Sequence, residues 1–266
     1  MRKAGVLLAA MLTLLLSRPA LCDGKAENAV RLSQSALGNR LPELTFTGTE
    51  GQSVRLSDYR GKPLLISLVY TGCADVCPTQ LESMIPAIKA AQRALGADSF
   101  SAITIGFDTK NDTPSRLKSF ARTRGAVLPN WKFLAADEET LEALSKSVGF
   151  GFYSRAGGFD HLAQVSVIDG EGRLYQQLYG AVFEPPLVVE PLKALVFNRN
   201  KPLVSVAALI DRIKWFCTVY DPAAGRYYFN YSLFLSIGIG LVCFGLVLAF
   251  MLKEWRQLSS RASQPK

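Results

Sequence analysis

Residues 61–80 read GKPLLISLVYTGCADVCPTQ, and this stretch decides the fold. The run from Leu64 to Tyr70 is apolar except for one serine, which is typical of a strand buried on both faces of a sheet. A short loop then brings Cys73 and Cys77, and Pro78 marks the start of a helix, where its missing N–H costs little. This order predicts a thiol site, because the positive end of a helix dipole favours the thiolate, which is both the nucleophile and the metal ligand.

The spacing of the two cysteines leaves two kinds of chemistry open. Three residues separate Cys73 from Cys77, rather than the two of a thioredoxin-type pair. If the loop already turns as a helix, the two side chains lie on one face about one turn apart. They are then near enough to close a disulfide or to share one metal ion.

The segment YTGCADVCPT, residues 70–79, closely resembles the cysteine motif of the Sco/SenC family. Members of that family have a thioredoxin fold and bind copper for cytochrome c oxidase assembly. The resemblance covers roughly residues 41–197 and includes FDTKNDTP at 107–114, similar to the aspartate-rich loop of the family. It also includes FDH at 159–161 followed by VSVIDGEG at 165–172, which looks like the ligand histidine, strand and turn of the family.

The resemblance implies a copper site formed by Cys73, Cys77 and His161, with copper held as Cu(I), Cu(II) or both. His161 is the only histidine in the chain, and soft sulfur together with imidazole suits Cu(I) and can also hold Cu(II). Asp160 or a backbone carbonyl would orient the other ring nitrogen. Asp108 would approach the site from the aspartate-rich loop, unless the residues that follow it simply cap the next helix.

Four other interpretations of the cysteine pair differ in what they require. A structural disulfide is one, although a bridge at a strand-to-helix loop is poorly placed to staple a fold. Zinc is disfavoured because three ligands make an incomplete structural site. A peroxidase would need arginines around the cysteine loop, and the sequence lacks them there. The serious rival is thiol–disulfide exchange, in which Cys73 attacks a partner disulfide and Cys77 resolves the mixed species.

The remaining pattern predicts an α/β, thioredoxin-like domain with an N-terminal hairpin and insertions. We expect strands at 41–46, 53–56, 64–70, 100–107, 131–134, 164–168 and 173–179. Helices are expected at 81–95, 114–123, 137–149 and 186–197. The order of strand, helix and strand, then helices, a hairpin and a last helix, is that of an elaborated thioredoxin fold.

Both ends of the chain carry membrane signals. Residues 1–22 combine a charged start, an apolar run and a small-residue exit, which predicts a cleaved signal peptide, with an uncleaved anchor as the alternative. Residues 231–252 form 22 positions without a charge, which span roughly 33 Å as a helix. The tail 253–266 has four positive residues and one negative, so it is expected in the cytoplasm. The chain is then a single-pass inner-membrane protein whose main domain faces the periplasm, a C-terminally anchored variant of the family.

The interior is divided accordingly. We expect a spacer at 23–40, the thioredoxin-like domain at 41–199 and an amphipathic juxtamembrane segment at 200–230.

The net charge is +8, of which residues 1–22 carry +3 and the tail +3, leaving +2 for residues 23–252. A nucleic-acid-binding function is therefore excluded, because little positive charge remains to form a basic patch on the folded domain.

The sequence thus predicts a membrane-anchored copper metallochaperone that delivers copper to a cytochrome c oxidase copper centre. Its partners would be the copper-receiving oxidase subunit and either another copper carrier or a thiol reductant. If the protein is a catalyst, the activity is thiol–disulfide exchange by Cys73 and Cys77, which reduces the cysteines of an oxidase subunit or of another extracytoplasmic protein.

Overall fold

The computed structural model describes residues 24–74, 76–197, 210, 213, 217–221, 224 and 226–262. The predicted signal peptide at 1–22 and most of the predicted amphipathic segment at 200–230 lie outside this part of the chain. The chain divides into two compact units, residues 1–196 and residues 197–266, and each is described by itself.

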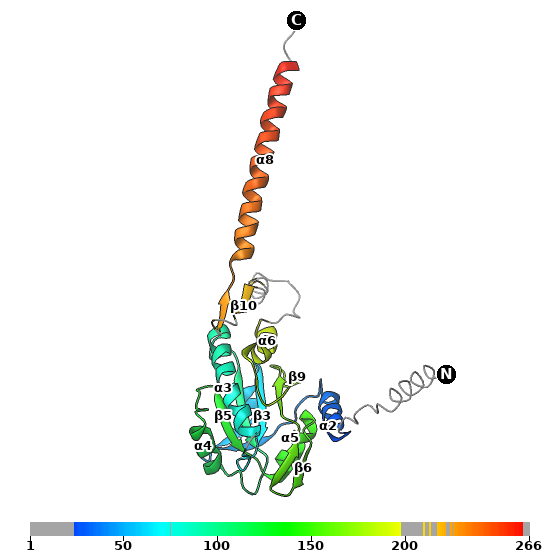
Figure 1. Ribbon diagram of the computed structural model, residues 1–266, viewed down its shortest axis with the longest axis vertical. Helices are drawn as coiled ribbons and strands as arrows, with labels where there is room; N and C mark the ends of the chain where they lie inside the picture. Colours follow the sequence, from blue (N-terminus) through cyan, green and yellow to red (C-terminus); the bar gives the residue numbers. More distant parts are fainter. Residues whose placement is uncertain are drawn as a thin grey trace, which may run out of the picture. The chain divides into compact units, whose positions relative to one another are not determined.

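The first unit is built on a mixed sheet of seven strands in the order β2-β1-β5-β4-β3-β8-β9 (Figure 1). Strands β3, β4 and β5 run parallel, whereas β1 is antiparallel to β5 and β8 is antiparallel to β3. Every residue of β3, β4 and β8 is buried, which confirms the predicted burial of the central strands on both faces. The strands are β1 Thr45–Gly48, β2 Ser53–Arg55, β3 Leu64–Val69, β4 Ser101–Gly106, β5 Trp131–Ala135, β8 Gln164–Ile168 and β9 Leu174–Tyr179.

Helices pack on this sheet, with α3 against α6 and α4 against β5. Their ends follow capping rules: the Thr113 side chain accepts a hydrogen bond from the Arg116 N–H at the start of α4, and Asp137 accepts one from the Thr140 N–H at the start of α5. Helix α5 ends at Gly149, which adopts a left-handed conformation. The helices are α2 Gly24–Ser35, the 3-10 helix η1 Leu56–Tyr59, α3 Val76–Leu95, α4 Pro114–Thr123, α5 Glu138–Val148 and α6 Pro185–Val196.

The structure confirms the thioredoxin-like class. The strand predicted at 41–46 is β1 at Thr45–Gly48, and the structure differs from the sequence prediction in three further places. The expected spacer contains helix α2, whose Gln34 donates a hydrogen bond to the Tyr179 hydroxyl at 2.6 Å. A short hairpin of β6 (Phe152–Arg155) and β7 (Gly158–His161) was not predicted. Helix α3 begins at Val76, before Pro78 and before the predicted start at 81. A proline is tolerated in the first turn because the N–H groups there have no intrahelical acceptors.

The topology brings three chain segments to one end of the sheet. The parallel pair β3 and β4 end there together, and the loops at 70–74 and 107–113 follow them. Strand β8 is antiparallel to β3, with Val165 opposite Ser67, so β8 begins where β3 ends. The hairpin that precedes β8 therefore delivers His161 to the end of the sheet where the cysteine loop lies.

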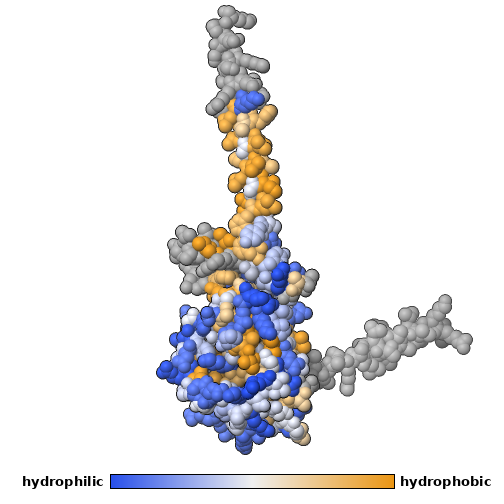
Figure 2. Space-filling view, turned by 90° about the vertical axis from the view of Figure 1, so that its left-hand side faces the viewer, coloured by the Kyte–Doolittle hydropathy of each residue, from blue (hydrophilic) through white to orange (hydrophobic). Residues whose placement is uncertain are grey.

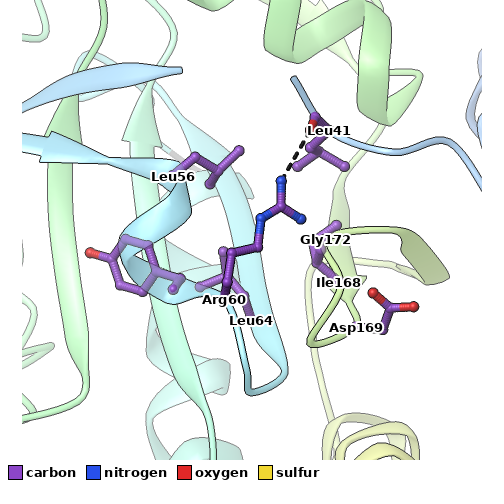
Figure 3. Close-up of a pocket in the computed structure, with 8 residues that line it drawn as sticks. Leu41, Leu56, Arg60, Leu64, Ile168, Asp169 and Gly172 are labelled. Atoms are coloured by element: carbon purple, nitrogen blue, oxygen red, sulfur yellow. Dashed lines mark hydrogen bonds between the residues drawn. The ribbon is translucent and has the colours of Figure 1, made fainter. Parts of the chain in front are cut away.

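Arg60 lies at the opposite end of β3, away from the cysteine loop. Its guanidinium donates hydrogen bonds to the backbone carbonyls of Leu41 and Glu171, and Figure 3 shows the side chain reaching toward Leu41 past Gly172. Gly172 has φ +79°, and any Cβ at that position would overlap the Arg60 guanidinium. Arg60 thus ties the segment before β1 to the β8–β9 turn, which is a structural role.

The second unit holds a small hairpin and a long helix. Strands β10 (Thr218–Asp221) and β11 (Arg226–Phe229) pair antiparallel, and the Tyr220 and Tyr227 rings lie 5.2 Å apart. Cys217 is buried, and its carbonyl accepts the Asn230 N–H at 2.7 Å. Helix α8 (Ser232–Ala262) contains Phe234–Lys253, which is long and apolar enough to cross a membrane (Figure 2). The predicted apolar segment at 231–252 is therefore helical from Ser232 onward, and Cys243 lies within it.

Candidate metal centre

The side chains of Cys77 and His161 lie next to each other in the site. Cys77 lies in the first turn of α3 with no exposed surface, and His161 is the half-buried last residue of β7. The Cys77 Sγ is 3.9 Å from the His161 Nε2. The structure therefore brings the only histidine of the chain to one of its two motif cysteines.

Cys73 lies in the loop before α3 and is half-buried. Its Sγ accepts the N–H of Cys77 at 3.4 Å, and its own N–H donates to the Tyr70 carbonyl at 3.1 Å. The Cys77 N–H belongs to the first turn of α3, where backbone donors have no intrahelical acceptor. Such a donor favours the thiolate of Cys73, which is the more accessible of the two thiols.

The three predicted ligands do not have the spacing of a formed metal site. Across the described ranges, no group of three or more His, Cys, Asp or Glu side chains is spaced to hold a metal ion. For metal bonds of about 2.3 Å to sulfur and 2.0–2.1 Å to nitrogen, two ligands of a trigonal ion lie about 3.8 Å apart. The Cys77–His161 pair at 3.9 Å fits this spacing. The Cys73 sulfur lies beside this pair, 3.4 Å from the Cys77 nitrogen.

The imidazole of His161 is held in one orientation by its backbone. Its Nδ1 lies 3.1 Å from the Leu162 carbonyl oxygen, so the proton on Nδ1 donates there and Nε2 presents its lone pair toward Cys77. Burial lowers the pKa of His161, which keeps the ring neutral at physiological pH. A neutral imidazole is the form that binds metal ions.

Asp160 does not orient this ring. Its exposed carboxylate pairs with Arg155 across the β6–β7 hairpin at 3.3 Å. Of the two orienting groups considered from sequence, the backbone carbonyl, that of Leu162, makes the contact with His161.

Aromatic rings surround the histidine. The His161 ring centroid lies 5.1 Å from that of Phe107, 5.5 Å from Phe150 and 6.3 Å from Tyr70. Burial also raises the pKa of the Cys77 thiol, with Cys73 adding to the effect. Burial and a hydrogen bond to Cys73 raise the pKa of Tyr70 as well. Burial thus favours the neutral forms of Cys77 and His161, whereas Cys73 is partly exposed.

The aspartate-rich loop contributes a residue that sequence reasoning missed. Asp112 is 2% exposed, and its Oδ1 accepts the N–H and the hydroxyl of Thr71 at 2.8 and 2.7 Å. Its Oδ2 accepts the Asp108 N–H at 2.9 Å, and the lack of a side chain at Gly106 leaves room for this approach. Burial raises the pKa of Asp112. This carboxylate fixes the loop two residues before Cys73.

Asp108, predicted from the sequence to approach the metal site, has a different environment. Its carboxylate accepts an exposed hydrogen bond from the Asn111 side chain at 2.8 Å. The capping alternative is correct for Thr113, which caps α4, and Asp112 turns toward Thr71 instead. The sequence carried no signal for this, because the contact joins residues 41 positions apart.

The mixed sheet, the paired helices and the thiol loop at the start of α3 define a thioredoxin-like domain with a dithiol and a histidine at one end of the sheet. The family model described as SCO1/SenC matches residues 35–196. The chain belongs to the SCO1/SenC family.

Relatives agree with this assignment. The chain is 28% identical over 100 residues to the human protein "SCO1 homolog, mitochondrial", a match that covers 37% of this chain and 33% of the relative. It is 24% identical over 137 residues to a "SCO2-like protein" of Rickettsia felis, covering 48% of this chain and 64% of the relative. The chain thus spans less than two thirds of the length of each of these two curated relatives.

A solved structure shares the fold of the first unit. The structure of Bradyrhizobium japonicum ScoI with copper bound is 26% identical, with a TM-score of 0.50, and the match covers 60% of this chain and 99% of that one. Copper binding is thus a property of that relative, the Bradyrhizobium ScoI.

Proposed function

We propose that this protein is a membrane-anchored copper metallochaperone that carries copper to a cytochrome c oxidase copper centre through Cys73, Cys77 and His161. The observation that carries the proposal is the 3.9 Å approach of His161 Nε2 to the buried sulfur of Cys77. Copper in the related ScoI, which is 26% identical, supports the choice of metal. Two thiolates and one imidazole are a donor set that suits Cu(I) and accepts Cu(II).

The burial of the three groups suggests the order in which they would meet the ion. Cys73 is half-buried and would contact incoming copper first, whereas Cys77 is fully buried behind it. Ligation displaces thiol protons, so binding releases them to solvent. The raised pKa of Cys77 keeps its proton in place until a metal ion displaces it. The aromatic rings around His161 would then exclude water from the inner side of the ion.

The membrane anchor would determine the compartment in which copper is delivered. Helix α8 supplies a candidate span, and residues 253–266 carry four positive charges and one negative. The positive-inside rule would place this tail in the cytoplasm and the thioredoxin-like domain in the periplasm, in keeping with a signal peptide at 1–22. The copper-receiving oxidase subunit would then be the partner, and another copper carrier or a thiol reductant would load or reset the site.

One observation favours a second function, thiol–disulfide exchange. Cys73 and Cys77 are both thiols, and the Cys73 sulfur lies against the N-terminal turn of α3. In this reaction the Cys73 thiolate attacks a partner disulfide and forms a mixed disulfide. Cys77 then attacks Cys73, which releases the partner as a dithiol and leaves a Cys73–Cys77 disulfide. This role needs both cysteines and makes no use of His161.

Copper binding separates the two functions. The reduced full chain in detergent would be titrated with Cu(I) and Cu(II) against a competing chelator, as wild type, His161→Ala and Asp160→Asn. The proposal expects one ion per chain and an affinity at least a hundredfold lower in His161→Ala. Asp160→Asn is the matched control, because its carboxylate pairs with Arg155 and is expected to leave the affinity unchanged. An affinity that is indifferent to His161 contradicts the metallochaperone proposal and leaves the dithiol exchange as the better account.

A further inference from the structure

We propose that the β10–β11 hairpin lies in the headgroup layer of the membrane and places an apolar face, formed by Val219 and Tyr228, against a phospholipid surface. The inference rests on the proposed function in one respect, that α8 is a membrane anchor, and it is independent of copper. It assigns a partner to a surface that neither the anchor nor the thiol site uses.

The register of the hairpin puts Val219 and Tyr228 on one face. The two residues are direct partners across the strands, and successive side chains of a strand point to opposite faces. Val219 is 39% exposed and Tyr228 is 45% exposed. On the other face Tyr220 and Tyr227 are partners, and both are half-buried. Exposed apolar side chains are common singly, so the position of the exposed pair beside α8 decides what its partner is.

The hairpin is joined to the start of α8 by contacts as well as by the chain. The Asn230 N–H donates to the Cys217 carbonyl at 2.7 Å, and the Asn230 side-chain oxygen accepts the Ser232 N–H at 2.9 Å. The Phe229 ring stacks on that of Phe234, with centroids 6.1 Å apart and an angle of 22° between the ring planes. The hairpin and the first turn of α8 therefore pack together within the second unit (Figure 1).

The length of the apolar helix determines how far the hairpin lies from the hydrocarbon. The 20 residues of Phe234–Lys253 form about 30 Å of helix, which equals the thickness of the hydrocarbon core of a bilayer. Phe234 then lies at the hydrocarbon boundary, with the Phe229 ring 6.1 Å from its own. The polar layer on each side is about 5–8 Å thick, so Phe229 lies within it. Val219 and Tyr228 follow about 3.3 Å further along the strands, which places the exposed pair at headgroup level.

The aromatic content of the segment fits this layer. Four of the nine tyrosines of the chain fall within residues 220–231. Tyrosine is enriched at membrane interfaces, because its ring is apolar and its hydroxyl can hydrogen-bond to water and headgroups. The position at headgroup level, rather than the composition alone, favours lipid over a protein partner. So small a face orients the chain at the membrane but does not anchor it without α8.

Photolabelling of the full chain in phospholipid vesicles tests this depth. Two phospholipids each carry a diazirine, one on the acyl chain next to the glycerol and one at the acyl terminus, and peptide mass spectrometry identifies the labelled residues. The shallow probe should label Val219 and Tyr228 within threefold of Phe234. The deep probe should label the middle of α8 near Cys243 and not the hairpin. Tyr153, 67% exposed in the first unit, is the matched control, and its labelling should be at least tenfold below that of Tyr228.

Two variants test whether the apolar face makes the contact. A carboxylate in Tyr228→Asp favours water over the lipid boundary, so shallow labelling of Val219 should fall at least threefold while that of α8 stays the same. Tyr228→Phe keeps the ring and should leave the labelling of Val219 within twofold of wild type. Equal labelling of Val219 in the two variants, with the fold intact by circular dichroism, overturns the role of this face.

The labelling pattern separates this inference from the proposed function. If α8 is labelled but Val219 and Tyr228 are labelled no more than Tyr153, the inference is overturned, the face belongs to water or to a protein, and the anchor stands. If neither probe labels α8, the anchor falls and the hairpin contact falls with it. Shallow labels on the hairpin of a chain that binds no copper support the inference while the metallochaperone proposal falls.

Discussion

The Asp112→Asn substitution tests how the cysteine loop is held in place. In the wild type one carboxylate oxygen accepts the two donors of Thr71, and the other accepts the Asp108 N–H. An asparagine of the same shape keeps the oxygen that faces Thr71. Its NH₂ group then faces the Asp108 N–H, so that two donors oppose each other.

The expected cost follows from this mismatch. Hydrogen bonds to charged groups contribute about 1.5–3 kcal/mol, and a donor left without an acceptor costs about 1–3 kcal/mol when buried. Relief from burying a charge at a 2% exposed site offsets part of this. We therefore expect a net loss of about 2 kcal/mol in the free energy of unfolding. For a domain of this size that loss lowers the midpoint of thermal unfolding by about 4–8 °C.

Urea unfolding of the full chain in detergent, followed by near-ultraviolet circular dichroism, measures this loss. Asp108→Asn is the matched control, because its carboxylate makes an exposed hydrogen bond to Asn111, and a change within about 0.5 kcal/mol is expected. Equal stabilities of the two variants would refute the assignment of Asp112 as the residue that fixes the loop before Cys73.

Three further predictions concern other parts of the chain. The Tyr59 hydroxyl is buried and has no hydrogen-bond partner among the described residues; burial and Asp58 raise its pKa from 10.0 to about 12. The phenol of Tyr59 therefore loses its proton at lower pH in the unfolded state, so the free energy of unfolding falls between pH 10 and about 12. Tyr59→Phe should flatten this part of the curve of stability against pH, and an unchanged slope contradicts the prediction. Gly172→Ala should lower the free energy of unfolding by about 2 kcal/mol more than Gly51→Ala. Both glycines have φ near +80°, but only an alanine at 172 displaces the Arg60 guanidinium from the Leu41 and Glu171 carbonyls. A chain ending at Asn230 lacks α8 and should pass to the soluble fraction after lysis; retention in membranes would show that another segment anchors it.

The sequence predicted the centre of the fold well. The apolar runs that became β3 and β4 were long enough to indicate burial on both faces, and both strands are fully buried. Thr113 caps the start of α4 and Gly149 the end of α5, as their chemistry requires. These features are local, since a few neighbouring residues determine each of them.

The missed features depend on contacts between distant residues. Helix α2 is polar in sequence and is held by tertiary bonds such as Gln34 to Tyr179, 145 positions away. The β6–β7 hairpin is short and half-exposed, so it lacks the alternation that marks a strand. From the sequence, Asp112 is expected to belong to a helix cap, whereas in the structure its carboxylate accepts a hydrogen bond from Thr71. The family resemblance implied that His161 lies near Cys77. The physical reason, the register of β8 on β3, is visible only in the structure.

X-ray absorption at the copper edge of the loaded full chain tests the central claim most directly. A site formed by Cys73, Cys77 and His161 predicts two sulfur ligands and one nitrogen ligand in the wild type. In His161→Ala the nitrogen should disappear, and in Cys77→Ser one sulfur should. Because His161 is the only histidine in the chain, no other imidazole can replace it. A copper environment that is the same in wild type and His161→Ala would contradict the three-ligand site and, with it, the proposed role in copper delivery.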